Sequence, residues 1–127
     1  MSISSDQILH LIRRYPATSL LVLVIWVVCL IPIPETPLSN VSFIDKWTHF
    51  LMYAVLFIVC AAETCRYTRP NMLLLFVLAS LMGGLVELAQ AYLTTCRSGE
   101  WLDFFADAVG ALIGAALFSL FLRLRRR

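Results

Sequence analysis

The sequence contains few charged residues, and four long runs contain none at all. Only 14% of the residues are charged, whereas soluble domains average about a quarter, and 61% are hydrophobic. The runs without Asp, Glu, Lys or Arg cover residues 15–34, 47–62, 70–86 and 108–122. A bilayer core takes about 20 residues of helix, so the three shorter runs must recruit polar flanking residues to cross it. This composition excludes a soluble globular domain and predicts a membrane protein.

Other absences narrow the range of functions. A net charge of +2 from scattered residues excludes a nucleic-acid surface, because phosphate contacts require basic groups clustered on one face. No pair of cysteines has zinc-finger spacing, and no repeat is present. We therefore expect no nucleic-acid partner, no metal and no cofactor. Cys29 and Cys96 fall toward the same side and could pair in an oxidising compartment, although we interpret both as apolar filler.

The apolar runs predict an all-α integral membrane protein. We expect one domain over residues 1–127, a four-transmembrane-helix bundle with helices at about 17–33, 45–62, 71–93 and 101–122. Eight of the ten basic residues flank one side of this bundle, which the positive-inside rule makes cytoplasmic, together with both termini. The first helix is followed by prolines rather than by a cleavage site, so we expect an uncleaved anchor.

The segment before the first predicted helix has an amphipathic pattern. Its apolar residues between Ile8 and Ile12 fall along one side of a short helix, which Ser4 or Ser5 could cap. Such a pattern is typical of a helix that lies on the membrane surface. A frayed terminus is an equally good interpretation.

Polar residues inside the predicted spans gather toward the outer ends of three helices. His49 lies about one turn into the second helix, Glu87 in the last two turns of the third, and Asp107 in the first two turns of the fourth. Intramembrane charges normally face a protein interior or a watery cavity, and the cytoplasmic half shows no equivalent group. We predict a polar pocket open to the periplasm, lined by Asp45, Lys46, His49, Tyr53, Glu87, Gln90, Arg97, Ser98, Asp103 and Asp107.

Acidic side chains outnumber basic ones on this outer side. Counting Glu100, it holds five carboxylates against two basic residues, Lys46 and Arg97, if His49 is neutral. Crowded carboxylates cannot all remain ionised in a low dielectric, so at least one is expected to be protonated or to bind a cation. Glu87, deep on its helix, is our candidate for the protonated one.

Small residues accompany the acidic ones. Gly83 and Gly84 are adjacent, and Gly110 and Gly114 lie one turn apart. Such residues let helix backbones approach closely in lipid. They could serve packing within one chain or between the chains of a homo-oligomer.

Three motifs follow one another along the predicted spans. They are Asp45-Lys46-x-x-His49-x-x-x-Tyr53, then Glu87-x-x-Gln90, and then Arg97-Ser98 followed by Asp103-x-x-x-Asp107-x-x-Gly110-x-x-x-Gly114. Together they resemble the VanZ-like family of small bacterial membrane proteins, over residues 43–122. The chain has Asp107 where relatives often have Asn, and Cys96 where Gly often precedes the arginine.

The resemblance implies a cellular location more than it implies a chemical reaction. The family is named for a member linked to reduced susceptibility to teicoplanin, a glycopeptide that binds cell-wall precursors. It implies the bacterial cytoplasmic membrane and a role in the cell envelope. Our leading interpretation is recognition of the polar head of an envelope lipid or lipid-linked cell-wall intermediate. Arg97 and Lys46 would contact phosphate, and the carboxylates would contact hydroxyls or amines.

Three alternatives stay open. The polar residues could form only a structural ionic network. They could form an enzyme on a lipid head, with His49, Glu87 or Asp107 as acid and base, or with a metal held by these residues and Asp103. Proton- or cation-linked transport is the third, although the inner half of a pathway is missing.

Overall fold

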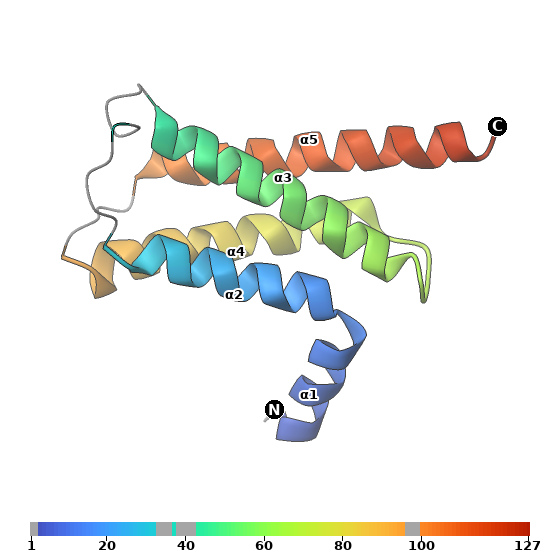
Figure 1. Ribbon diagram of the computed structural model, residues 1–127, viewed down its shortest axis with the longest axis horizontal. Helices are drawn as coiled ribbons and strands as arrows, with labels where there is room; N and C mark the ends of the chain where they lie inside the picture. The colour runs from blue at the N-terminus through green and yellow to red at the C-terminus, as the bar shows by residue number, and fades with distance from the viewer. Residues whose placement is uncertain (1–2, 33–36, 38–42, 96–99) are drawn as a thin grey trace.

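The computed structural model describes residues 3–32, 37, 43–95 and 100–127. Within these residues the chain forms five helices: α1 (Ser5–Arg14), α2 (Pro16–Leu30), α3 (Ile44–Thr64), α4 (Met72–Leu93) and α5 (Trp101–Arg125). Figure 1 shows α2 to α5 running side by side, while α1 projects from one end of α2. The described residues are all-α, as predicted.

Three helices are long and apolar enough to cross a membrane by themselves: α3, α4 and α5. The helices α1 and α2 meet that test only as a pair, which is bent by 105° between Arg14 and Pro16. The described residues therefore hold three candidate spans, or four if the bent pair counts as one. Large apolar side chains such as Leu81, Leu117 and Phe121 are exposed on the bundle, as expected for surfaces that face lipid. The chain is a multi-pass membrane protein.

The N-terminal segment is a capped helix rather than a frayed terminus. The Ser4 hydroxyl accepts a hydrogen bond from the backbone N–H of Gln7 at 3.4 Å, and the Gln7 side chain accepts one from the N–H of Ser4 at 3.0 Å. This reciprocal pair is a capping box, with Ser4 as the cap. No residue of α1 is buried, and its apolar side chains between Ile8 and Ile12 are about half exposed.

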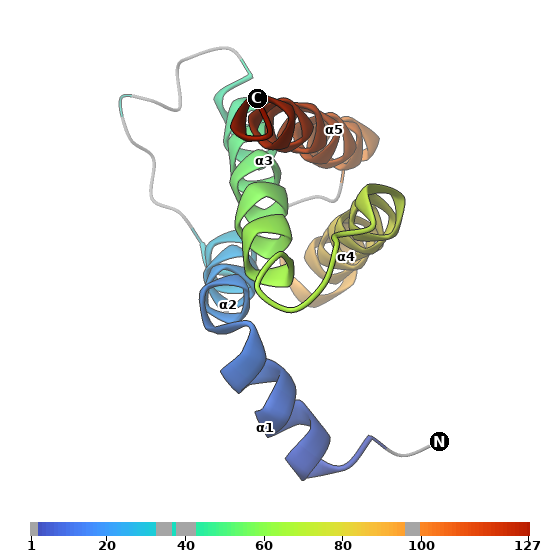
Figure 2. The same ribbon diagram turned by 90° about the vertical axis from the view of Figure 1, so that its right-hand side faces the viewer.

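The helices α3 and α5 form the most extensive interface and lie next to each other in both ribbon views (Figures 1 and 2). Glycines make this close approach possible. A Cβ added at Gly110 would collide with the carbonyl oxygen of Phe50, and one at Gly114 would lie 2.7 Å from the carbonyl oxygen of Ala54. The Gly110–Gly114 spacing therefore serves packing within this chain.

Helix direction determines where the polar residues meet. The chain enters α3 and α5 at the same end of the bundle at which α4 ends (Figure 1). A core that includes Tyr53, Phe57 and Val86 fills the bundle below that end. Polar residues early in α3 and α5 and late in α4 are thereby brought to one depth.

The opposite end of the bundle holds a buried carboxylate of its own. Glu63 is 5% exposed and accepts hydrogen bonds from the backbone N–H groups of Ala17 and Thr18, at 3.0 and 2.9 Å, and from the Thr18 hydroxyl at 2.7 Å. It thus satisfies donors at the N-terminus of α2, which attracts negative charge. The prediction that this half lacks embedded polar residues is wrong, because α3 continues to Thr64 and brings Glu63 inside.

Candidate functional site

His49 on α3 lies beside carboxylates from two other helices. Its Nδ1 is 2.9 Å from Oδ1 of Asp107 on α5 and 3.7 Å from Oε1 of Glu87 on α4. The exposed fractions are 0% for Asp107, 1% for His49 and 8% for Glu87. Because charged groups removed from water need partners, these contacts join three helices in one buried ionic network.

Lys46 continues the network toward the surface. Its Nζ is 2.7 Å from Oε2 of Glu100 and 3.1 Å from Oδ1 of the buried Asp103. Asp45 and Asp103 each place a carboxylate oxygen within 4.8 Å of a ring nitrogen of His49. His49 is therefore close to two pairs of carboxylates, and Lys46 neutralises only part of this charge.

Local helix geometry explains why acids collect here. Asp45 and Asp103 occupy the first turns of α3 and α5, where the helix dipole stabilises negative side chains. Phe43, just before α3, has a φ of 61°, a left-handed conformation that non-glycine residues seldom adopt. This left-handed residue comes immediately before the acidic first turn of α3.

Gly83 makes room for the Asp107 carboxylate. A Cβ at Gly83 would lie 2.8 Å from Oδ2 of Asp107, so a larger residue would displace it. That oxygen and Oε1 of Glu87 have no hydrogen-bond partner among the residues the structure describes. The fully buried Tyr53 hydroxyl has none there either, and Tyr53 follows His49 by one turn on the same side of α3. Three polar atoms near the His49–Asp107 contact thus lack hydrogen bonds within the described chain.

Gln90 contacts a different helix. Its Nε2 donates a hydrogen bond to the backbone carbonyl of Cys29 at 2.9 Å, and its side chain is 1% exposed. This contact ties the last turns of α4 to the end of α2. Gln90 therefore links α4 to α2.

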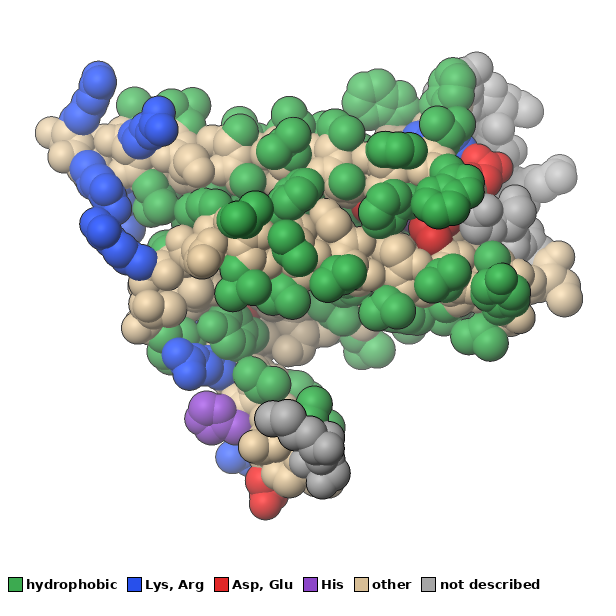
Figure 3. All heavy atoms as spheres, turned by 180° about the vertical axis from the view of Figure 1, so that it is seen from behind, with side chains coloured by type: hydrophobic (Ala, Val, Ile, Leu, Met, Phe, Trp, Pro, Cys, Tyr) green, Lys and Arg blue, Asp and Glu red, His purple; other side chains and the backbone are tan. Residues whose placement is uncertain are grey.

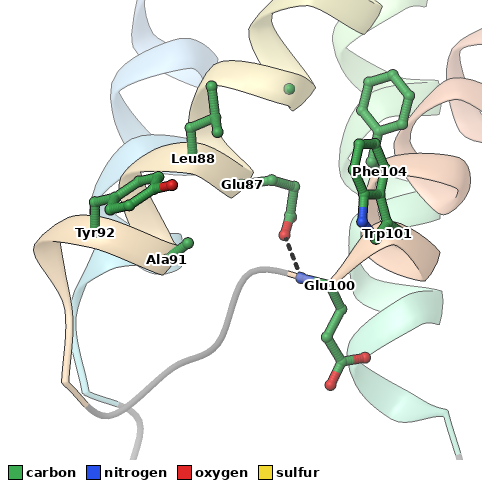
Figure 4. Close-up of a pocket in the computed structure, with 8 residues that line it drawn as sticks. Glu87, Leu88, Ala91, Tyr92, Glu100, Trp101 and Phe104 are labelled. Atoms are coloured by element: carbon green, nitrogen blue, oxygen red, sulfur yellow. Dashed lines mark hydrogen bonds between the residues drawn. The ribbon is translucent and has the colours of Figure 1, made fainter.

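A groove with a volume of about 300 Å³ opens between the end of α4 and the start of α5. We call it the α4–α5 groove; it is lined by Gly84, Glu87, Leu88, Ala91, Tyr92, Glu100, Trp101 and Phe104. Figure 4 shows Glu87 reaching across it, where Oε2 accepts a hydrogen bond from the backbone N–H of Glu100 at 3.1 Å. Tyr92 and Trp101, 82% and 81% exposed, stand at its edges. The groove combines apolar walls with one end of the ionic network.

Most of the predicted site residues meet at this end of the bundle. Arg97 and Ser98 lie outside the described residues, as does Cys96. Glu100 belongs to the site, but the pocket predicted from the sequence does not include it. The sequence places Glu100 only among the carboxylates of the outer side. Its partner Lys46 is 54 positions away, so no local spacing indicates the pair.

Comparison with known protein families, curated proteins and solved structures finds no match for this chain. The properties of the site therefore come from its own geometry. That geometry establishes a helical membrane protein with a buried ionic network among α3, α4 and α5.

Proposed function

We propose that the α4–α5 groove binds a membrane lipid and recognises its polar head. The observation that carries this proposal is the position of Glu87, a buried carboxylate that lines a groove walled by Leu88, Trp101 and Phe104 between two candidate spans. A groove between membrane spans faces acyl chains, which its apolar walls suit. The carboxylate at its polar end suits the head group.

The groove selects for hydrogen-bond donors. Glu87 and Glu100 present acceptor oxygens, so hydroxyl or ammonium groups of a sugar or amine head match them. Lys46 is engaged by Glu100 and Asp103, which leaves it fewer donors for a phosphate. A phosphate contact through Arg97 stays a prediction, since Arg97 lies outside the described residues.

The distribution of basic residues supports an orientation in which the groove faces the periplasm of a bacterial cytoplasmic membrane. Figure 3 shows Lys and Arg side chains gathered at one end of the bundle and acidic side chains near the other. The exposed basic residues at the first end include Arg13, Arg66, Arg69, Arg123, Arg125, Arg126 and Arg127. By the positive-inside rule this end and both termini are cytoplasmic.

On this orientation α2 is the first of four spans, and α1 lies along the cytoplasmic surface. The 15 residues of α2 extend only about 22 Å, less than the bilayer core of about 30 Å. The 105° bend turns α1 away from the bundle, and its exposed apolar side chains suit the interface between lipid and water. The carboxylate of Glu63 then caps α2 from the cytoplasmic side.

Membership of the VanZ-like family is part of this proposal. It rests on the three motifs, whose residues His49, Glu87 and Asp107 meet in one network. Because the family's namesake concerns an antibiotic that binds cell-wall precursors, the favoured ligand is a lipid or lipid-linked intermediate of the envelope. A role in glycopeptide susceptibility would follow from that binding.

The other interpretations have weaker support. The His49–Asp107 pair resembles the oriented imidazole of a general base, but His49 is 1% exposed and does not line the groove. A transport pathway gains an acidic group in Glu63, yet three hydrogen bonds from α2 already engage that side chain. Of these interpretations, only lipid binding uses Glu87 and Glu100, the residues of the network that line the groove.

Native mass spectrometry of the protein released from mild detergent tests the proposal. We expect wild type to retain a defined lipid, and Ala91→Trp, which fills the groove, to lose it. Leu85→Trp is the matched control, because Leu85 is exposed on α4 but lies outside the groove. Equal lipid retention by Ala91→Trp and Leu85→Trp, or no defined lipid on folded wild type, would refute lipid binding in the groove.

A further inference from the structure

Three buried side chains offer metal-ligand atoms at one point between α3, α4 and α5. One ring nitrogen of His49 and one oxygen each of Glu87 and Asp107 lie within 4.8 Å of one another. The separations from Nδ1 of His49 are 2.9 Å to Asp107 and 3.7 Å to Glu87. Ligand atoms about 2.0–2.2 Å from one ion lie about 3–3.5 Å apart, so small side-chain shifts complete this set.

A buried hydroxyl beside these residues independently points to a ligand. Tyr53 is 0% exposed, its hydroxyl has no hydrogen-bond partner in the described part of the chain, and it follows His49 by one turn on the same side of α3. Buried hydroxyl groups are nearly always hydrogen-bonded. Among the described residues, Oε1 of Glu87 and Oδ2 of Asp107 also have no hydrogen-bond partner. A cation bound between the two carboxylates would engage their oxygens, and a water ligand on it would offer a partner to the Tyr53 hydroxyl.

The charge of the cluster also favours a cation. Two carboxylates and one neutral imidazole carry a charge of −2, which a divalent ion balances. Without an ion, the two carboxylates and a protonated His49 carry a net charge of −1. The nearby cation Lys46 is engaged by Glu100 and Asp103. Net charge inside a membrane costs several kcal/mol by most estimates, so balance matters here.

The donor set indicates the class of ion. Imidazole nitrogen favours zinc and the other transition metals, whereas Ca²⁺ and Mg²⁺ prefer oxygen ligands only. One nitrogen and two carboxylate oxygens suit Zn²⁺ or Mn²⁺.

We propose that His49, Glu87 and Asp107 together bind one divalent transition-metal ion, Zn²⁺ or Mn²⁺, between α3, α4 and α5. The site does not depend on lipid binding, because Glu87 turns Oε1 toward His49 and Oε2 toward the α4–α5 groove. Metal content and lipid retention are measured separately, so either proposal can fail alone.

The first test measures the metal content of purified protein by mass spectrometry after incubation with Zn²⁺ or Mn²⁺ and removal of free ion. We expect about one ion per wild-type chain and a loss of at least tenfold in Glu87→Gln and Asp107→Asn. Glu63→Gln is the matched control, because it removes a buried carboxylate at the opposite end of the bundle. A wild type without bound metal, or a Glu87→Gln variant that retains the wild-type amount, would overturn the proposal.

The second test avoids the ligand variants, which could fail to fold. The chain has two histidines, and His10 is exposed on α1. Mn²⁺ bound to a His10→Ala variant should show electron spin-echo modulation from a directly bound imidazole nitrogen, which then belongs to His49. Mn²⁺ without this nitrogen signal would contradict the assignment.

Discussion

The imidazole of His49 and the carboxylate of Asp107 lie 2.9 Å apart in the second turns of α3 and α5, both inaccessible to solvent. This contact lies about one turn from Gly110, where an added Cβ would collide with the Phe50 backbone of α3. The buried His49–Asp107 contact and the close packing at Gly110 therefore occupy adjacent turns of the same interface. The two features should be separable by mutation.

Removing His49 alone should destabilise the bundle. His49→Phe leaves the carboxylates of Glu87 and Asp107 together without the imidazole, and breaking a buried pair in this way costs about 3–5 kcal/mol. The double variant His49→Phe, Asp107→Leu should regain part of that loss. Unfolding in mixed micelles, analysed as a double-mutant cycle, measures the coupling, expected at about 0.5–3 kcal/mol.

Thr48→Val is the matched control for His49→Phe. The Thr48 side chain is exposed, and its hydroxyl donates a hydrogen bond to the carbonyl of Ile44 in its own helix. Its effect on unfolding should stay within about 0.5 kcal/mol. Additive effects of the His49 and Asp107 changes would show that the two side chains do not interact.

A methyl group at Gly110 should disrupt the α3–α5 interface. Gly110→Ala drives a Cβ into the carbonyl of Phe50, and such overpacking costs about 1–3 kcal/mol. Gly84→Ala is the control, since its Cβ would meet the Phe104 ring at an ordinary 3.6 Å. That change should be neutral or stabilising by up to about 1 kcal/mol. Thermal unfolding in detergent distinguishes the two, and equal melting temperatures would refute the packing account.

The sequence predicts the helices well because each apolar run is long and bounded by charges or prolines. It also predicts the meeting of His49, Glu87 and Asp107, because helix direction and three- or four-residue spacing place them at one depth. The partner of Gln90 could not be predicted, since the backbone carbonyl of Cys29 has no sequence signature. Pairs such as Lys46–Glu100 depend on how the chain enters α5, which spacing does not encode.

Glu63 shows a second limit of sequence reasoning. A helix end is uncertain by one or two residues, and two residues decide whether this carboxylate is outside the bundle or buried. Its role as an acceptor for the N-terminus of α2 becomes visible only when α2 and α3 are placed together. An acidic residue near a predicted helix end is therefore buried when the N-terminus of a neighbouring helix supplies its hydrogen-bond donors.

Glu63→Gln should loosen the contact between α2 and α3. The amide replaces one acceptor oxygen by a donor that faces a backbone N–H, so we expect a loss of about 1–3 kcal/mol in unfolding free energy. Thr18→Val removes only the hydroxyl donor and should cost about 1 kcal/mol. Unfolding in mixed micelles measures both. A Glu63→Gln protein as stable as wild type would mean that the negative charge of Glu63 does not stabilise the N-terminus of α2.

The proposed orientation predicts which cysteines are accessible from outside the cell. Cys65 is exposed at the end of α3, next to the basic end of the bundle. In a Cys96→Ala background, a membrane-impermeant maleimide should label Cys65 only after lysis. A Thr95→Cys variant that also lacks Cys65 and Cys96 should be labelled in intact cells with a permeabilised outer membrane. The reverse pattern would invert the topology and place the groove at the cytoplasmic face.

The most direct measurement of the central claim is photocrosslinking with a membrane lipid that carries a diazirine on its acyl chain, followed by peptide mass spectrometry. Lipid binding in the α4–α5 groove predicts labels concentrated at residues 88–92 and 101–104, and their loss in Ala91→Trp but not in Leu85→Trp. Labels spread evenly over the exposed leucines of α4, unchanged by Ala91→Trp, would show that lipid contacts this protein only as solvent.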